Sequence, residues 1–162
     1  MPATGLNHVS VSASDLEESI DFYRELFGVE PIATPNFGFP VQWLRLGPNQ
    51  LHIFKRPGSA PTYHHVALTV DDFEEVYEKA RQRDSFDGTT FGHHLYELPG
   101  DVAQLYLRDP GGNLVEVDAP GATRLAAGIR REMKALAEVR PQNAENLRAT
   151  LFHDAGRQPL AT

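Results

Sequence analysis

An internal repeat is the strongest constraint that this sequence places on its fold. The segment Leu6–Val11 aligns with Tyr63–Leu68 at a shift of 57 residues, and the same shift aligns Asp15–Glu18 with Asp72–Glu75. Segments that match at a fixed spacing indicate two copies of one structural unit. We therefore expect two modules of the same topology within the 162 residues of the chain.

Each copy begins with a pattern that predicts a strand followed by a helix. Apolar and polar residues alternate in the opening run, as in a strand with one buried face. Ser14 and Asp71 are then each followed three residues later by a glutamate, which is the spacing of a helix N-cap. The first helix is expected to end at Gly28, since glycine readily adopts a left-handed conformation, and the second to cover about 73–83.

Three short apolar runs separated by turn residues follow each predicted helix. They predict strands at 29–33, 41–46 and 51–54 in the first copy, and at 92–97, 102–107 and 114–117 in the second. The sequence Asp-Pro-Gly-Gly-Asn at 109–113 predicts a turn between the last two strands. Each copy is therefore expected to form a βαβββ module in an α+β fold.

The chain beyond the repeat has a different composition. Residues 1–121 carry a formal charge of -10, whereas residues 122–162 carry +3. Apolar residues spaced for one helix face predict an amphipathic helix over 122–139, and these are Leu125, Ile129, Met133 and Leu136. Pro141 would end this helix, and Asn143 is expected to cap a shorter one that continues to about Phe152. We expect a domain at 1–121, with modules at about 5–58 and 62–119, and a helical extension at 122–162.

Charge and cysteine content exclude several classes of function. The net charge of -7 would repel nucleic-acid phosphates and anionic lipid headgroups, so neither is an expected partner. No apolar run approaches the roughly 20 residues of a membrane span, and the N-terminus does not resemble a signal peptide, so a cytoplasmic location is predicted. Because there is no cysteine, any bound metal must be held by histidines and carboxylates.

Strand alternation places four candidate metal ligands at equivalent positions of the two copies. His8 and His65 fall on the more polar face of the two opening strands. His52 and Glu116 fall on the same kind of face of the two closing strands. Imidazole and carboxylate groups that converge from a rigid scaffold suit a divalent transition metal. A metal site is therefore expected where these four side chains meet.

The paired modules and these four positions resemble the vicinal oxygen chelate superfamily. That superfamily includes glyoxalase I, bleomycin-resistance proteins, fosfomycin-resistance enzymes and extradiol dioxygenases. The resemblance covers residues 5–119 and implies that the modules form an open, curled mixed sheet around a metal cavity. It also implies that His8, His65 and Glu116 are the constant metal ligands, that His52 lies at the variable ligand position, and that the protein forms a homodimer.

The resemblance leaves two roles open for His52. In glyoxalase-like lyases and isomerases, this position completes a four-ligand site that suits Zn(II) or Ni(II). In extradiol dioxygenases, two histidines and one glutamate bind Fe(II) or Mn(II), and a histidine at this position acts as an acid or base. The run 105–112 matches much of the dioxygenase signature and implies that Tyr106 donates a hydrogen bond to the substrate.

The expected function is that of a divalent-metal-dependent enzyme whose small-molecule substrate chelates the metal through neighbouring oxygens. The match around Tyr106 favours an extradiol-type ring-cleaving dioxygenase with Fe(II) or Mn(II). A glyoxalase-like lyase or isomerase is one alternative. A metal-free drug-binding protein of the bleomycin-resistance kind is the other, although such proteins generally lack this set of ligands.

Overall fold

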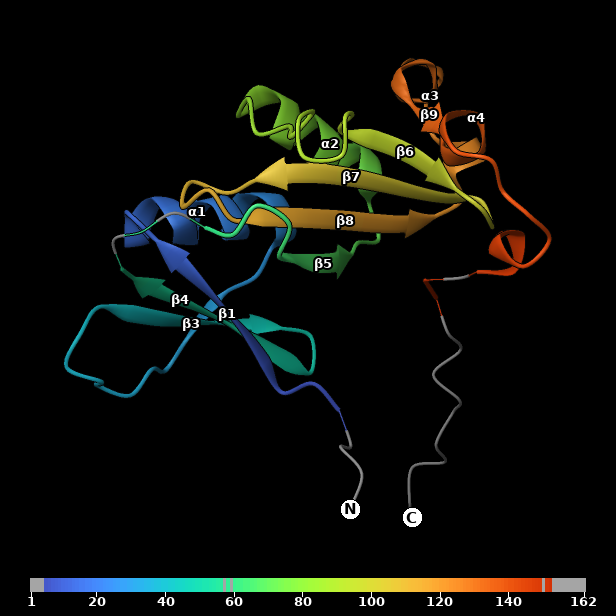
Figure 1. The fold of residues 1–162 in the computed structure, drawn as a ribbon. Helices are drawn as coiled ribbons and strands as arrows, with labels where there is room; N and C mark the ends of the chain where they lie inside the picture. The colour runs from blue at the N-terminus through green and yellow to red at the C-terminus, as the bar shows by residue number, and fades with distance from the viewer. Residues whose placement is uncertain (1–4, 57, 59, 150, 153–162) are drawn as a thin grey trace, which may run out of the picture.

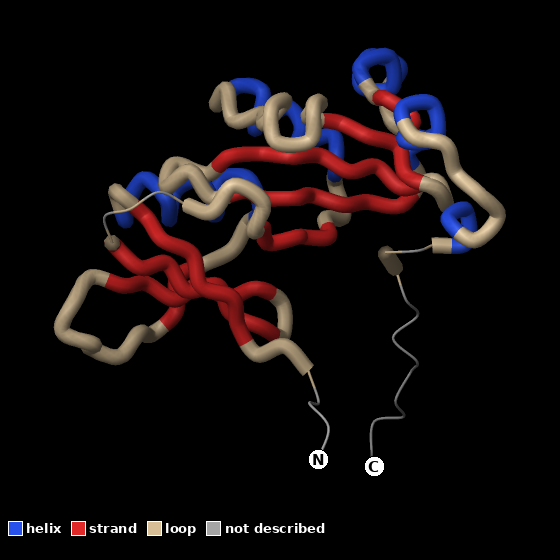
Figure 2. Tube along the Cα trace, viewed as in Figure 1, coloured by secondary structure: helices blue, strands red, loops and turns tan. Residues whose placement is uncertain are grey.

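The computed structural model describes residues 5–56, 58, 60–149 and 151–152, and its elements form two modules with the same order (Figures 1 and 2). The first module contains β1 (His8–Ala13), α1 (Leu16–Phe27), β2 (Pro31–Ile32), β3 (Val41–Leu46) and β4 (Asn49–Lys55). The second contains β5 (His65–Thr69), α2 (Phe73–Gln82), β6 (Leu95–Leu98), β7 (Val102–Arg108) and β8 (Leu114–Pro120). The prediction of an α+β fold with paired βαβββ modules is confirmed.

Each module has its own open mixed sheet. Sheet A has the strand order β1-β4-β3-β2, and sheet B has the order β5-β8-β7-β6, extended by β9 (Lys134–Ala135). The opening strand pairs in parallel with the closing strand in both modules, β1 with β4 and β5 with β8. The repeat in the sequence is thus a repeat in topology, with equivalent residues at equivalent places on the two sheets.

The caps of both helices lie one residue later than the sequence pattern predicts, although α2 begins at residue 73 as expected. Asp15, and not Ser14, caps α1, because its carboxylate accepts a 3.0 Å hydrogen bond from the backbone N–H of Glu18. Asp72, and not Asp71, caps α2 in the same way. An aspartate in extended backbone places its oxygen over the free N–H groups of the first turn. Gly28 ends α1 with a φ of 61°, as predicted.

One hydrophobic core joins the two modules through their helices. Helices α1 and α2 contact each other, and each covers one face of the sheet of its own module. The largest fully buried side chains include Phe22 and Tyr23 of α1, Tyr77 of α2, Leu51 and Ile53 of β4, and Leu105, Leu107, Val115 and Val117 of sheet B. The opposite face of each sheet, here called its open face, lies away from these helices and carries the polar half of each alternating strand.

The turn between β7 and β8 connects the second module to the first. The Tyr23 hydroxyl donates a buried 3.0 Å hydrogen bond to the Asp109 carboxylate, and the Asn113 amide donates to the backbone oxygen of Ser12 at 2.7 Å. A Cβ atom added at Gly111 would meet the Ser12 backbone oxygen closely. The predicted Asp-Pro-Gly-Gly-Asn turn therefore also holds β1 and α1 in place.

The C-terminal extension differs from the long amphipathic helix that the apolar spacing predicts. It consists of a 3₁₀ turn (Ala122–Arg124), α3 (Ala127–Glu132), β9, α4 (Leu136–Val139) and a second 3₁₀ turn (Asn146–Arg148). The helix is interrupted because residues 134–135 pair with β6 and protect the edge of sheet B. The predicted helix capped by Asn143 is only a 3₁₀ turn whose cap residue is Glu145, although the Asn143 side-chain oxygen accepts from the backbone N–H groups of Glu145 and Asn146. No helix in the described residues is long and apolar enough to cross a membrane.

Candidate metal centre

The open face of sheet A carries a stack of three rings from three neighbouring strands. The rings of His8 on β1 and His52 on β4 lie 4.3 Å apart between centroids and are nearly parallel. On its other side, the His52 ring stacks on Trp43 of β3 at 4.4 Å, because these two residues are directly paired in the sheet. His52 is buried in this stack, whereas His8 is exposed. Two of the predicted site residues therefore lie side by side.

Hydrogen bonds determine which ring nitrogens of this pair can accept a metal or a proton. The Nδ1 atom of His8 lies 2.9 Å from the Asn7 side-chain oxygen and donates to it, which leaves Nε2 with a lone pair. The Nε2 atom of His52 donates to the Gln50 amide oxygen at 2.8 Å, which leaves Nδ1. Burial, together with the neighbouring His8, lowers the pKa of His52. The neutral form of His52, which binds metals and accepts protons, is therefore favoured.

The open face of sheet B carries the other two predicted ligands, His65 on β5 and Glu116 on β8. The His65 Nε2 atom lies 3.5 Å from the Glu116 Oε2 atom. The His65 Nδ1 atom donates to the backbone oxygen of Tyr63 at 2.9 Å, so the lone pair of the neutral ring is on Nε2 and faces the carboxylate. Bonds of about 2.1 Å to one ion would place two adjacent ligand atoms about 3.0 to 3.4 Å apart. The pair therefore fits two positions of a divalent metal.

A buried polar network surrounds Glu116. Tyr106 lies directly opposite Glu116 in the sheet, and its hydroxyl donates to the Gln104 side-chain oxygen at 2.6 Å. The Gln104 amide in turn donates to the Asp118 carboxylate at 3.3 Å. Burial and the nearby Glu116 carboxylate raise the pKa of Tyr106, and the same two causes raise the pKa of Asp118 to about 7. Tyr106 consequently keeps its proton and acts as a hydrogen-bond donor.

Sequence reasoning placed Glu116 on the more polar face of β8 but missed Gln104. Nothing in a single glutamine on a strand distinguishes it from a solvated side chain. The role of Gln104 is visible only in the pairing of the strands. Gln104 lies opposite Asp118 and shares a face of β7 with Tyr106, two residues along the strand. Gln104 thus links two residues that alternation alone leaves separate.

The four predicted ligands form two pairs, one on each sheet. Within the described part of one protomer, no three His, Asp or Glu side chains form a group that could hold a metal ion. His8 and His52 lie together on sheet A, and His65 and Glu116 lie together on sheet B. Each pair can supply half of the expected set of ligands.

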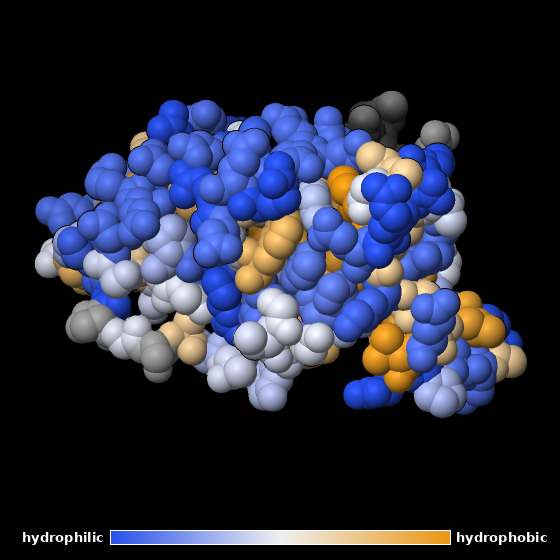
Figure 3. All heavy atoms as spheres, turned by 90° about the horizontal axis from the view of Figure 1, so that it is seen from above, coloured by the Kyte–Doolittle hydropathy of each residue, from blue (hydrophilic) through white to orange (hydrophobic). Residues whose placement is uncertain are grey.

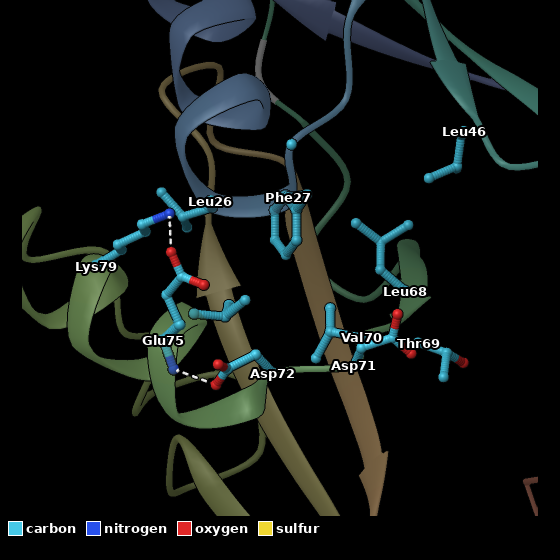
Figure 4. A pocket seen from close by; sticks show the side chains of 12 residues that line it. Leu26, Phe27, Leu46, Leu68, Thr69, Val70, Asp71, Asp72, Glu75 and Lys79 are labelled. Atoms are coloured by element: carbon cyan, nitrogen blue, oxygen red, sulfur yellow. Dashed lines mark hydrogen bonds and ion pairs between the residues drawn. The ribbon is translucent and has the colours of Figure 1, made fainter.

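A cavity of about 380 Å³ lies between the modules on the side of the helices (Figure 4). The end of α1 at Phe27 and the beginning of α2 border it. Three of its four charged side chains already have partners, since Glu75 pairs with Lys79 at 2.7 Å and the Asp72 carboxylate caps α2. None of the predicted site residues lines this cavity. The chemistry is therefore expected on the open faces of the sheets and not here.

Comparison with known proteins identifies the family. The chain belongs to the Glyoxalase/Bleomycin resistance protein/Dioxygenase superfamily, whose family model matches residues 5–117. Mitochondrial methylmalonyl-CoA epimerase of Mus musculus is 30% identical over 131 residues, which are 70% of this chain and 71% of that protein. Metallothiol transferase FosB of Lysinibacillus sphaericus (strain C3-41) is 30% identical over 130 residues, 72% of this chain and 82% of that protein. Glyoxylase I 4 of Arabidopsis thaliana is 28% identical and covers 70% of each chain.

Solved structures agree on the fold. The fosfomycin resistance protein FosX of Listeria monocytogenes superposes with a TM-score of 0.60 at 17% identity, covering 75% of this chain and 96% of that one. Lactoylglutathione lyase of Agrobacterium tumefaciens superposes with a TM-score of 0.54 at 23% identity, covering 73% of this chain and 95% of that one. The resemblance seen in the sequence is therefore confirmed for the family and for the fold.

Proposed function

We propose that this protein is a divalent-metal-dependent enzyme whose small-molecule substrate binds the metal through two neighbouring oxygens. The observation that carries the proposal is the His65–Glu116 pair, whose facing atoms are 3.5 Å apart. The Tyr63 carbonyl holds His65 in the tautomer that can bind a metal, which is the usual arrangement around a ligating histidine. Zn(II), Ni(II), Mn(II) and Fe(II) all suit such ligands.

The remaining ligand would come from a second copy of the chain. His8 and His52 lie on the open face of sheet A, and one protomer does not bring them into a group with His65 and Glu116. A homodimer in which sheet A of one protomer faces sheet B of the other would place His8 beside His65 and Glu116. His52 would then lie next to the metal as a fourth ligand or as an acid and base.

The chemistry we favour is proton transfer or addition without a change of oxidation state, as in a lyase, isomerase or transferase. A bound divalent ion would act as a Lewis acid and stabilise negative charge on the substrate oxygens. Neutral His52 could accept a proton from the substrate, and Tyr106 could donate a hydrogen bond to one of its oxygens. The relatives described above support this choice, since their names are those of an epimerase, a thiol transferase and a glyoxylase.

An extradiol-type dioxygenase is the second candidate. The position of Tyr106 favours it, because this tyrosine lies directly opposite Glu116 and keeps its proton. In that version His52 would be the acid and base, and only His8, His65 and Glu116 would hold Fe(II) or Mn(II). None of the relatives named above is an extradiol dioxygenase.

Metal analysis of mixed variants tests both the metal and the shared site. Protein purified without a tag should retain about one divalent ion per chain, and His8→Ala and His65→Ala should each lose it. When the two variants are unfolded together and refolded, each heterodimer should regain one intact site, because the intact sheet A of one chain meets the intact sheet B of the other. Loss of metal that mixing does not reverse would place the site within one chain. Full retention of the metal in both variants would overturn the proposed ligands, and a wild type that holds no metal even after reconstitution would favour a metal-free drug-binding protein.

Oxygen dependence separates the two candidates. Anaerobic protein loaded with Fe(II) should leave a panel of catechols unchanged when oxygen is admitted. A yellow ring-cleavage product that disappears in Tyr106→Phe would instead support the dioxygenase.

A further inference from the structure

A mostly apolar pocket lies where the C-terminal extension meets the hairpin between β6 and β7. Its volume is about 280 Å³. Six apolar residues line it, three from the hairpin and three from the extension: Leu98, Pro99, Val102, Leu136, Ala149 and Leu151. Gln142 and Asn146 complete the lining, and both side chains already bond within the extension. No charged side chain lines the pocket in the part of the chain that the structure describes.

The floor of this pocket continues the open face of sheet B. Val102 lies two residues from Gln104 and four from Tyr106 along β7, so all three point to the same face. Leu98 lies opposite Val102 and packs against the apolar cluster that contains Tyr106. At about 3.3 Å per residue, the four-residue separation places the pocket about 13 Å along the strand from Tyr106 and its partner Glu116.

The extension forms a wall at this end of the sheet. Figure 1 shows it passing from the α2 side of sheet B, around the end of β6 and β7, towards the opposite side. Two contacts anchor it, the pairing of β9 with β6 and the 2.7 Å hydrogen bond from the Tyr77 hydroxyl to Glu132. The family model matches residues 5–117, so this wall lies outside the matched residues.

We propose that this pocket binds the apolar end of an elongated substrate whose oxygen-bearing end lies at Glu116. This inference rests on the function proposed above and specifies the substrate class. The pocket suits an uncharged alkyl or aryl group, because a charged group would lose its hydration without gaining a partner. Its volume holds about nine groups the size of a water molecule, at about 30 Å³ each.

A second copy of the chain is the competing occupant. Figure 3 shows apolar side chains gathered at the end of the molecule that carries the extension. Val139, Leu147 and Leu151 of the extension are all exposed, and Leu151 also lines the pocket. Continuity with the open face of sheet B favours the substrate, since Val102 at the pocket and Tyr106 beside Glu116 share one face of β7.

Alkyl hydroxamates test the proposal, because their two neighbouring oxygens chelate a metal and their chain length can be varied. We expect Mn(II)-loaded protein to bind acetohydroxamate weakly. Affinity should then rise by about fourfold for each methylene that enters the pocket, once the chain spans about 13 Å, as in decano- and dodecanohydroxamate. Ala149→Trp should fill the pocket and return the long chains to the affinity of acetohydroxamate. Ala144→Trp, an exposed position outside the pocket, is the matched control and should bind as the wild type does.

The outcomes distinguish a failure of the subsite from a failure of the metal site. If acetohydroxamate binds but affinity is independent of chain length, or if Ala149→Trp binds long chains normally, the subsite is wrong and the metal site stands. If no hydroxamate and no metal bind, the proposed function fails. Octanol binding to metal-free protein, lost in Ala149→Trp and kept in Ala144→Trp, would still support the pocket. A change of oligomeric state in Ala149→Trp alone would assign the pocket to a protein interface and overturn the proposal.

Discussion

The two modules share a skeleton but differ in what surrounds their equivalent residues. His8 and His65 occupy the same place on their opening strands, as do His52 and Glu116 on their closing strands. In the first module these residues belong to a stack of aromatic rings. In the second they border a buried network of Tyr106, Gln104 and Asp118. The repeat therefore determines where the side chains lie, and their neighbours determine what those side chains can do.

The modules also differ in how their hairpins are held. The turn between β7 and β8 contacts β1 and α1 of the first module through Asp109, Gly111 and Asn113. In the turn between β3 and β4, a Cβ atom added at Gly47 would meet nothing within 4 Å. The second module thus supports the first through the β7–β8 turn, although the residues on the open faces of the two modules differ. Substitutions in the β7–β8 turn test how far the two modules act as one unit.

The largest effect is expected for Asp109→Ala. This change leaves the buried Tyr23 hydroxyl and the backbone N–H of Asn113 without their shared acceptor. Each unpaired buried group costs about 1–3 kcal/mol, and the gain from removing a buried carboxylate offsets part of this cost. We expect the free energy of unfolding to fall by about 3 kcal/mol in urea denaturation, in a single transition for both modules. Separate transitions of the two modules would show that they fold independently.

Asp21→Ala provides the control for this substitution. Asp21 lies on the exposed face of α1 and forms only a loose ion pair with Arg24, at 3.7 Å. Exposed pairs contribute little to stability, so its free energy of unfolding should stay within about 0.5 kcal/mol of the wild type. An equal loss in both variants would mean that the Tyr23–Asp109 contact has no special role in joining the modules.

A smaller loss is expected for Gly111→Ala, which tests how closely the turn approaches β1. The new Cβ would collide with the Ser12 backbone, and overpacking of this kind costs about 1–3 kcal/mol. In Gly88→Ala the added Cβ meets nothing within 4 Å, so this variant should unfold like the wild type. The difference between their denaturation midpoints measures the contact. Equal midpoints would show that the turn and β1 can separate without cost.

The repeat made the fold of the two modules predictable. The C-terminal extension was not predictable from the periodicity of its apolar residues. The strands that apolar runs predict at 41–46, 102–107 and 114–117 are found at 41–46, 102–108 and 114–120, and the four candidate ligands lie on the open faces that alternation predicts. The long helix over 122–139 was wrong, because its apolar spacing also suits separate contacts with the second module. Ile129 is buried in the core, while residues 134–135 pair with β6. Local periodicity cannot reveal that a sheet edge will capture two residues of a helix.

The candidate site was predictable in its residues but not in its surroundings. Alternation places His65 and Glu116 on the open face, and the parallel pairing of β5 with β8, in which His65 lies opposite Leu114, brings them within 3.5 Å. The ring stack on His52 and the link through Gln104 depend on which strands are neighbours, and a single sequence does not reveal this pairing. The sequence also does not reveal that the ligands are divided between two sheets. This division depends on the packing of α1 against α2.

The smallest effect concerns His94, which stacks on Phe86 at 4.5 Å beside the extension that only the second module carries. Its Nε2 atom is buried without a hydrogen-bond partner. Burial lowers its pKa, as do the neighbouring His93 and Lys134, and the Glu132 carboxylate at 3.8 Å opposes them. A histidine whose folded pKa lies below its unfolded value near 6.5 stabilises the fold above that pH, and this stability is lost as the pH falls.

His94→Phe keeps the stacked ring but removes the titrating group. Its stability relative to the wild type should therefore improve between pH 7 and pH 5, by on the order of 0.5 kcal/mol in urea denaturation. Phe86→Leu loosens the same packing but keeps the imidazole, so its stability should change in parallel with that of the wild type. If the stability of His94→Phe relative to the wild type instead decreases as the pH falls, protonated His94 must gain more from Glu132 than it loses by burial. Acid would then tighten the contact between the extension and the second module, a property for which the first module has no counterpart.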